Sequence, residues 1–221
     1  MHTGTSIAIV GGHGKISRAL IPLLVAGGHH VIALARREEQ LADLEALGAE
    51  ARRLDIEAAD EGDFAVALAG CDAVVFSAGG GPDGNIERKR TVDLEGSLMS
   101  ITAAQVTGIN RFVQVSAMRV DRPVDPTRGE VWAAYVAAKR DADEALRDSG
   151  LAWTILRPGG LTDGPGTGLV TLAAEVEPGR IPRADVAAVI ATVLDNPATD
   201  GKQWEVVSGS TPIAEAIAAA V

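Results

Sequence analysis

Short apolar stretches alternate with amphipathic stretches along nearly the whole chain. Most apolar stretches are rich in Val, Ile and Ala without polar alternation, which is typical of strands buried on both faces of a parallel sheet. The stretches between them carry apolar residues at helical spacing. The expected strands are 6–10, 31–35, 50–54, 73–77, 111–116, 152–156 and 203–207, and the expected helices are 15–26, 38–47, 60–68, 86–107, 130–148 and 184–194, followed by a short Ala-rich helix.

This alternation predicts an α/β fold, namely a Rossmann-type doubly wound parallel sheet in three αβα layers. The chain has 221 residues, which is enough for one domain with a full core and too few for two of ordinary size. It contains no internal repeat, low-complexity linker or shift in composition. We therefore expect a single domain over residues 1–221, in which the part from about residue 158 onward forms a small extension on the substrate side.

Charge and cysteine content narrow the classes of function. The net charge of −10 disfavours general binding to nucleic acid or to anionic membranes. The single cysteine excludes an internal disulfide and a Cys-based zinc site, and it fits a reducing compartment. No metal site is expected from the four histidines. Without a secretory signal or a membrane-length apolar run, we expect a cytoplasmic protein, either a monomer or a homodimer.

The first strand runs directly into a glycine-rich turn, which is followed by the first helix. Glycines let the backbone bend sharply and approach a pyrophosphate closely, and the helix N-terminus offers free N–H groups to it. Ser17 stands where a third glycine is usual, so it either pushes the helix slightly outward or bonds a backbone carbonyl. The turn predicts a dinucleotide site made by Gly11, Gly12, His13, Gly14, Lys15 and Ile16.

The end of the second strand indicates which dinucleotide binds. A site for NAD(H) usually places Asp or Glu there, to bind the ribose 2′-hydroxyl. This chain has Arg36 and Arg37 instead, and a guanidinium offers a 2′-phosphate charge-assisted hydrogen bonds. We therefore expect NADP(H) to be preferred over NAD(H). The alternative is that both arginines are solvated surface charges.

Other strand ends should lie at the same edge of the sheet as the glycine turn, where ligands of such folds bind. Asp55 and Ile56 follow the third strand and are expected beside the adenine, although Asp55 could simply begin a turn. The small residues Ser77, Ala78 and Gly79 follow the fourth strand and leave room for the ribose and pyrophosphate.

The candidate chemistry rests on the only tyrosine, Tyr135, which lies four residues before Lys139 on an expected helix. At this spacing the two side chains share a helix face. A nearby ammonium, together with the charge of an oxidised nicotinamide, would lower the tyrosine pKa from about 10 and make it an acid/base near neutrality. Ser116 ends the fifth strand at the same edge and could bond the substrate oxygen. Alternatively, Tyr135 is a core aromatic, Lys139 a surface charge and Ser116 a strand cap.

An acidic stretch lies further along the same helix. Asp141, Asp143 and Glu144 are expected on its solvated face rather than as an acid/base pair.

Together, the glycine turn, Ser116, the segment Tyr135-Val136-Ala137-Ala138-Lys139 and the segment Arg157-Pro158-Gly159-Gly160 resemble the short-chain dehydrogenase/reductase superfamily. They are most similar to its atypical branch of small NAD(P)H-binding proteins, of NmrA-like and sugar-epimerase-like type. The resemblance covers essentially the whole chain. It implies that the tyrosine is the acid/base, that the serine holds the reacting oxygen, that the lysine also binds the nicotinamide ribose, and that Pro158, Gly159, Gly160 and Leu161 lie near the nicotinamide.

Two functions remain open from the sequence. The first is an NADP(H)-dependent oxidoreductase, which moves a hydride to or from a small carbonyl or alcohol, or an epimerase that uses the same residues. The second is an NAD(P)H-sensing binding protein without catalysis, as the NmrA-like resemblance suggests. The chain after Arg157 is shorter than in relatives with a full sugar-binding lobe, which argues against a large nucleotide-sugar substrate. The substrate pocket is expected between the loops 80–85, 118–129 and 161–168.

Overall fold

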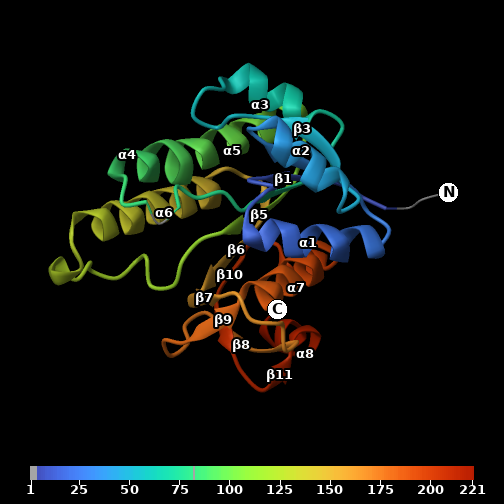
Figure 1. Cartoon of the computed structure of the whole chain (residues 1–221). Coiled ribbons are helices and arrows are strands. Elements are labelled where there is room, and N and C mark those ends of the chain that lie inside the picture. The colour runs from blue at the N-terminus through green and yellow to red at the C-terminus, as the bar shows by residue number, and fades with distance from the viewer. Residues whose placement is uncertain (1–3, 82) are drawn as a thin grey trace.

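The computed structural model describes residues 4–81 and 83–221, which are built around a nine-stranded sheet (Figure 1). The seven strands expected from the sequence lie side by side and are all parallel. Their order, with the first and fourth strands adjacent at the centre, is that of a Rossmann fold, so the predicted fold class is confirmed. In spatial order they are β3 (Glu50–Arg53), β2 (His30–Ala35), β1 (Ser6–Val10), β4 (Ala73–Phe76), β5 (Arg111–Val115), β6 (Ala152–Pro158) and β10 (Lys202–Ser208).

Helices cover both faces of this sheet (Figure 1). In the described residues, no helix is both long enough and apolar enough to cross a membrane. One face is covered by α1 (Lys15–Ala26), α2 (Glu38–Glu45), α7 (Arg183–Leu194) and α8 (Ile213–Ala220). The opposite face is covered by α3 (Glu61–Leu68), α5 (Gly96–Thr107) and α6 (Glu130–Asp148).

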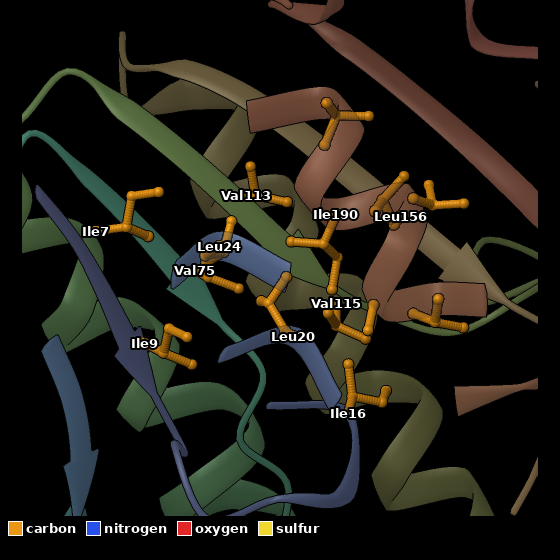
Figure 2. Close-up of a cluster of buried hydrophobic side chains, with 14 of the residues drawn as sticks. Ile7, Ile9, Ile16, Leu20, Leu24, Val75, Val113, Val115, Leu156 and Ile190 are labelled. Atoms are coloured by element: carbon orange, nitrogen blue, oxygen red, sulfur yellow. The ribbon is translucent and has the colours of Figure 1, made fainter. Parts of the chain in front are cut away.

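The two faces of the sheet bury separate apolar clusters, because successive strand residues point to opposite sides. In β1, Ile7 and Ile9 join the cluster under α1 and α7, while Ala8 and Val10 join the cluster under α3 and α5. Figure 2 shows the first of these clusters, in which Leu20 and Ile190 from the two helices meet side chains of the strands. Burial on both faces explains why the strands read as continuous apolar runs.

The helix expected over 86–107 differs from the prediction. It begins as a short α-helical turn, α4 (Ile86–Arg88), continues as a π-helical segment over Lys89–Glu95, and only then becomes α5. A π-helical turn holds more residues than an α-helical turn, and such turns are frequent at functional sites. The pattern of the sequence predicted the helical stretch but not this change of pitch.

The last third of the chain holds more strand than expected. The predicted extension from about residue 158 is continuous with the main sheet, because β10 pairs directly with β6. One short strand, β8 (Leu169–Ala173), pairs with β10 in antiparallel fashion, and another, β11 (Thr211–Pro212), pairs antiparallel with β8, so the sheet is mostly rather than wholly parallel. The segments not anticipated are β7 (Gly160–Thr162), β8 (Leu169–Ala173), β9 (Arg180–Pro182) and β11 (Thr211–Pro212), and the 3₁₀ turns Pro126–Arg128 and Pro197–Thr199.

Candidate cofactor and active site

The glycine turn between β1 and α1 packs so closely on the neighbouring strand that two of its positions exclude larger residues. Gly11 has φ +82°, and a Cβ added to it would lie 2.7 Å from the Cα of Ala78. A Cβ on Gly12 would lie 3.0 Å from the Cβ of Ala33. The hydroxyl of Ser17 is buried and donates a hydrogen bond of 2.9 Å to the carbonyl of Gly11. The serine therefore closes the turn through a backbone carbonyl, which is one of the two roles that the sequence left open for it.

Beside this turn lies a cavity of about 300 Å³, called here the loop cavity. The hydroxyl oxygen of Ser77 is buried and has no hydrogen-bond partner among the described residues, so it is free to bind a ligand group at this place. The close-packed glycines and this hydroxyl fit the ribose and phosphates of a dinucleotide. Nine of the predicted cofactor residues line the cavity, namely Gly11, His13, Gly14, Arg36, Asp55, Ile56, Ser77, Ala78 and Gly79.

The two predicted 2′-phosphate ligands separate in the structure. Arg36 lines the loop cavity, and its guanidinium lies 3.6 Å from the carboxylate of Glu57, which lines the same cavity. Glu57 is also paired with Arg88 at 3.2 Å. Arg37 is not among the lining residues of the loop cavity; it lies at the start of α2, exposed, with its Nε 3.1 Å from Glu39. Only Arg36 is therefore placed to contact a ligand in this cavity.

A second cavity of about 800 Å³, the central cavity, continues from the loop cavity. The two share Gly14, Ser77, Ala78 and Gly79, so together they form one cleft along the carboxyl ends of the strands. Lys15 and Ile16 contribute to its wall. Lys15 is not directed at the glycine turn, however, because its ammonium lies 2.6 Å from Asp163, in the segment that follows β7.

Tyr135 and Lys139 from α6 both line the central cavity, as their spacing predicted. Lys139 is buried, and its ammonium donates to the carbonyls of Val115 at 3.2 Å and Ala78 at 3.4 Å. It also lies 3.2 Å from the carboxylate of Asp93, which is 1% exposed and accepts a second hydrogen bond from the N–H of Gly80. The lysine is thus half of a buried ion pair. The alternative of a surface charge is wrong.

The Lys139–Asp93 ion pair influences the pKa values of both Lys139 and Tyr135. Burial opposes the charged form of Lys139, but Asp93, Tyr135 and Asp143 together outweigh it and raise the pKa of Lys139 above its ordinary value. Burial likewise raises the pKa of Tyr135, the charge of Lys139 lowers it, and the charges of Asp93 and Asp143 raise it again. The net result is a pKa of Tyr135 above its ordinary value. The expected lowering by Lys139 is present but is outweighed.

Ser116 lies at the end of β5 and lines the central cavity. Its hydroxyl donates to the carboxylate of Asp143 at 2.7 Å. The same carboxylate accepts hydrogen bonds from Gln114 at 2.7 Å and from Arg157 at 2.9 Å. The prediction of a solvated face at Asp143 is wrong, because this side chain is 0% exposed. Ser116 therefore retains lone pairs that can accept a hydrogen bond, while its own hydrogen is used within the protein.

Charges within this buried network influence one another. Burial raises the pKa of Asp143, and the nearby Arg157 offsets only part of that rise. Arg157 also binds Asp121 with two guanidinium nitrogens, at 2.5 and 3.1 Å. The network connects β5, α6 and β6 below the floor of the cavity, so it holds Ser116 in one orientation.

A third cavity of about 780 Å³, the outer cavity, adjoins the central cavity and shares Tyr135, Ser116 and Leu161 with it. The predicted segment Pro158–Leu161 forms part of its wall. Of the predicted substrate loops, most of residues 118–125, Arg128 and Leu161 contribute to it. Gly80, Gly81 and Gly84 from the loop 80–85 line the central cavity, while Pro82 lies outside the described residues. Sequence reasoning missed the lining residues Lys89, Asp93, Pro178, Gly179 and Arg183.

The family described as NAD(P)H-binding matches residues 11–197, which begin within the glycine turn and end beyond α7. The chain belongs to this NAD(P)H-binding family.

Within residues 4–81 and 83–221, no three His, Cys, Asp or Glu side chains gather in a way that could hold a metal ion.

Three relatives of this NAD(P)H-binding protein cover nearly its whole length. The uncharacterized sugar epimerase YhfK of Bacillus subtilis is 41% identical over 96% of this chain and 98% of its own. A Bacillus halodurans structure with a provisional name as an NAD-dependent epimerase/dehydratase has a TM-score of 0.89 at 38% identity, and covers 98% of this chain and 100% of its own. The structure of the oxidoreductase YlbE of Lactococcus lactis has a TM-score of 0.85 at 28% identity, and the match covers 97% of this chain and 95% of its own.

Proposed function

We propose that this chain is an NADP(H)-dependent oxidoreductase of the short-chain dehydrogenase/reductase type, which acts on a small carbonyl or alcohol with Tyr135 as its acid/base. The proposal rests above all on one observation: Tyr135 and Lys139 line a cavity that is continuous with the glycine-turn cavity. The names of the relatives, a sugar epimerase and an oxidoreductase among them, are consistent with this chemistry.

The cofactor fits the cleft through residues of known position. The turn at Gly11 and Gly14 would hold the pyrophosphate, the free hydroxyl of Ser77 the adjoining sugar or phosphate, and Lys139 the nicotinamide ribose. When bound, the nicotinamide supplies or accepts a hydride at its C4. Tyr135 would hold a proton at Oη for the substrate oxygen, and Ser116 would accept a hydrogen bond beside it.

The electrostatics suit Tyr135 to the proton-donating role that carbonyl reduction requires. Because burial raises the pKa of Tyr135 above its ordinary value, its phenol is protonated at neutral pH and can donate to a carbonyl oxygen. Oxidation of an alcohol would need the phenolate, which burial and the charge of Asp93 disfavour. Epimerisation through a transient ketone would use the same residues without net redox change.

The central test is a screen of small aldehydes, ketones and quinones for oxidation of NADPH, followed by its absorbance. For a compound that is turned over, Tyr135→Phe should lower kcat by about 100-fold or more, the ordinary contribution of general acid catalysis. Circular dichroism and binding of NADPH by the variant provide the control for folding and for an intact cleft. A loss of less than tenfold would remove Tyr135 from this role, and silence across all compound classes would favour a sensor of NAD(P)H.

The preference for NADP(H) rests on Arg36 alone, since Arg37 does not line the cavity. Calorimetry should show that NADPH binds more tightly than NADH, and that Arg36→Ala removes the difference by weakening NADPH about tenfold or more, as expected for a charge-assisted hydrogen bond. Arg53→Ala, at an exposed position on the edge strand β3, is the matched control. Equal affinities in the wild type, unchanged by Arg36→Ala, would contradict the proposal.

A further inference from the structure

The walls of the central and outer cavities are strongly cationic, although the protein as a whole carries a net charge of −10. Apart from the Lys139–Asp93 pair, one carboxylate among the described residues lines these cavities, that of Asp125, and it accepts hydrogen bonds from Thr127. The cationic side chains on the same walls are Lys15, Lys89, Arg119, Arg122, Arg128 and Arg183. Positive charge is therefore concentrated where the substrate would lie.

Three of these cations already have acidic partners. Lys15 and Arg183 both bind Asp163, and Arg122 lies 2.7 Å from Glu175. These pairs leave little of that charge available for a ligand. The charge that remains free must come from the other side chains on the walls.

Arg119 and Arg128 have no ion-pair partner among the described residues. The Nε of Arg119 is buried and makes no hydrogen bond to any of them. Arg119 also has φ +63°, the only positive value in a non-glycine residue of the described chain. A strained backbone and an unsatisfied guanidinium nitrogen at one residue are costly, and such costs cluster at ligand sites.

Arg128 approaches the same space from the start of α6. Its guanidinium lies 3.6 Å from the ring centre of Trp132, one helical turn further on, and both residues line the central and outer cavities. Stacking on an indole orients the planar guanidinium while its N–H groups stay free for hydrogen bonds. Because Trp132 also lies beside Tyr135, with ring centres 5.5 Å apart, the arginine is placed next to the candidate acid/base.

We infer that the substrate is an anionic carbonyl compound, and that Arg119 and Arg128 bind its carboxylate or phosphate group while its carbonyl faces Tyr135. This inference rests on the proposed function for the carbonyl, but its anion-binding part stands on the two arginines. The cavities, at about 800 and 780 Å³, are large enough for a substrate whose anionic group is remote from its reacting carbon.

Binding can be tested without turnover in protein loaded with NADP⁺, which carries no hydride to transfer. Calorimetry would compare 4-formylbenzoate, its neutral methyl ester and benzyl phosphate. We expect the acid to bind at least tenfold more tightly than the ester, since a charge-assisted hydrogen bond is worth about 1.5–3 kcal/mol. Relative affinities of the acid and of benzyl phosphate distinguish a carboxylate site from a phosphate site.

Variants assign the effect to the two arginines. Arg128→Gln, at an exposed position that leaves the core intact, and Arg119→Gln should each weaken the acid about tenfold and leave the ester unchanged, while Arg53→Gln on the far edge strand should change neither. Thermal melts check the fold of each variant. Equal affinity for acid and ester, an acid preference that survives in the double variant, or no binding of either anion at millimolar concentration would each overturn the inference.

Activity separates this inference from the proposed function. If the wild type binds the acid selectively but none of the carbonyl compounds causes it to oxidise NADPH, the reaction proposal fails and the anion site stands. If turnover is found but acid and ester react with equal kcat/KM in the wild type and in both variants, the anion site fails and the oxidoreductase stands.

Discussion

Replacing Asp143 with asparagine should destabilise the protein far more than its sequence context suggests. Asp143 is 0% exposed, and its carboxylate is held by Gln114, Ser116 and Arg157. Breaking a buried ion pair by removing one charge typically costs about 3–5 kcal/mol. Arg157 keeps its contact with Asp121 in the variant, so we expect the lower end of that range, about 3 kcal/mol.

This loss can be measured by denaturation with urea or by heat. For a domain of about 150–250 residues, each kcal/mol shifts Tm by about 2–4 °C, so Asp143→Asn should lower Tm by roughly 6–12 °C. Asp141→Asn is the matched control on the same helix, because its side chain is about half exposed and, in the part of the chain that the structure describes, forms an ion pair with the neighbouring Arg140 alone. Exposed pairs of this kind contribute little, about 0–1 kcal/mol.

The reasoning depends on Asp143 being ionised in the folded protein. Burial raises the pKa of this carboxyl, and Arg157 opposes the rise. If Asp143→Asn lost less than about 1 kcal/mol, the folded protein would hold a neutral Asp143 and the buried ion pair would be refuted. A loss for Asp141→Asn as large as that for Asp143→Asn would also refute it, because the effect would then be unrelated to burial.

Two further perturbations test the cleft itself. Gly11→Ala places a Cβ 2.7 Å from the backbone of Ala78 at φ +82°. We therefore expect it to lower the free energy of unfolding by about 1–3 kcal/mol and to weaken NADPH binding. Unchanged NADPH affinity by calorimetry would contradict the close-packed turn. Asp93→Asn removes a charge that raises the pKa of Tyr135 and leaves the opposing charge of Lys139 less neutralised. Since reduction needs the protonated phenol, the alkaline decline of kcat should then begin at lower pH, and a pH profile whose decline stays in place or moves upward would contradict this coupling.

Much of the fold could be predicted because its signals are local. A buried strand followed by glycines and a helix lies within one short stretch of sequence, and so does the four-residue spacing of Tyr135 and Lys139. The role of Ser17 was open from the sequence, and one hydrogen bond to Gly11 decides it. These predictions needed no knowledge of which elements meet in space.

The parts that were missed depend on contacts between distant segments. Asp93 lies far from Lys139 in sequence, and only the packing of the π-helical segment on α6 brings them together. Asp143 stands within an acidic stretch of the sequence, which is typical of a solvent-exposed helix face. It is buried because it pairs with Arg157 from the neighbouring strand, and the sequence pattern does not reveal this contact. The strands β8 and β11 are short and partly exposed, and they form because β10 offers an edge to β8 and β8 in turn offers an edge to β11.

The π-helical segment over Lys89–Glu95 separates two requirements that one helix must meet. The following helix, α5, has to turn Ile101 and Ala104 toward the core, whereas Lys89 and Asp93 have to reach the cleft. One residue of register in an α-helix corresponds to about 100° of rotation, and a widened turn absorbs such an offset. The π-helical segment therefore rotates the side chains of α5 relative to those of Lys89 and Asp93. Core packing and the placement of charges in the cleft are thus set independently along a single helical stretch.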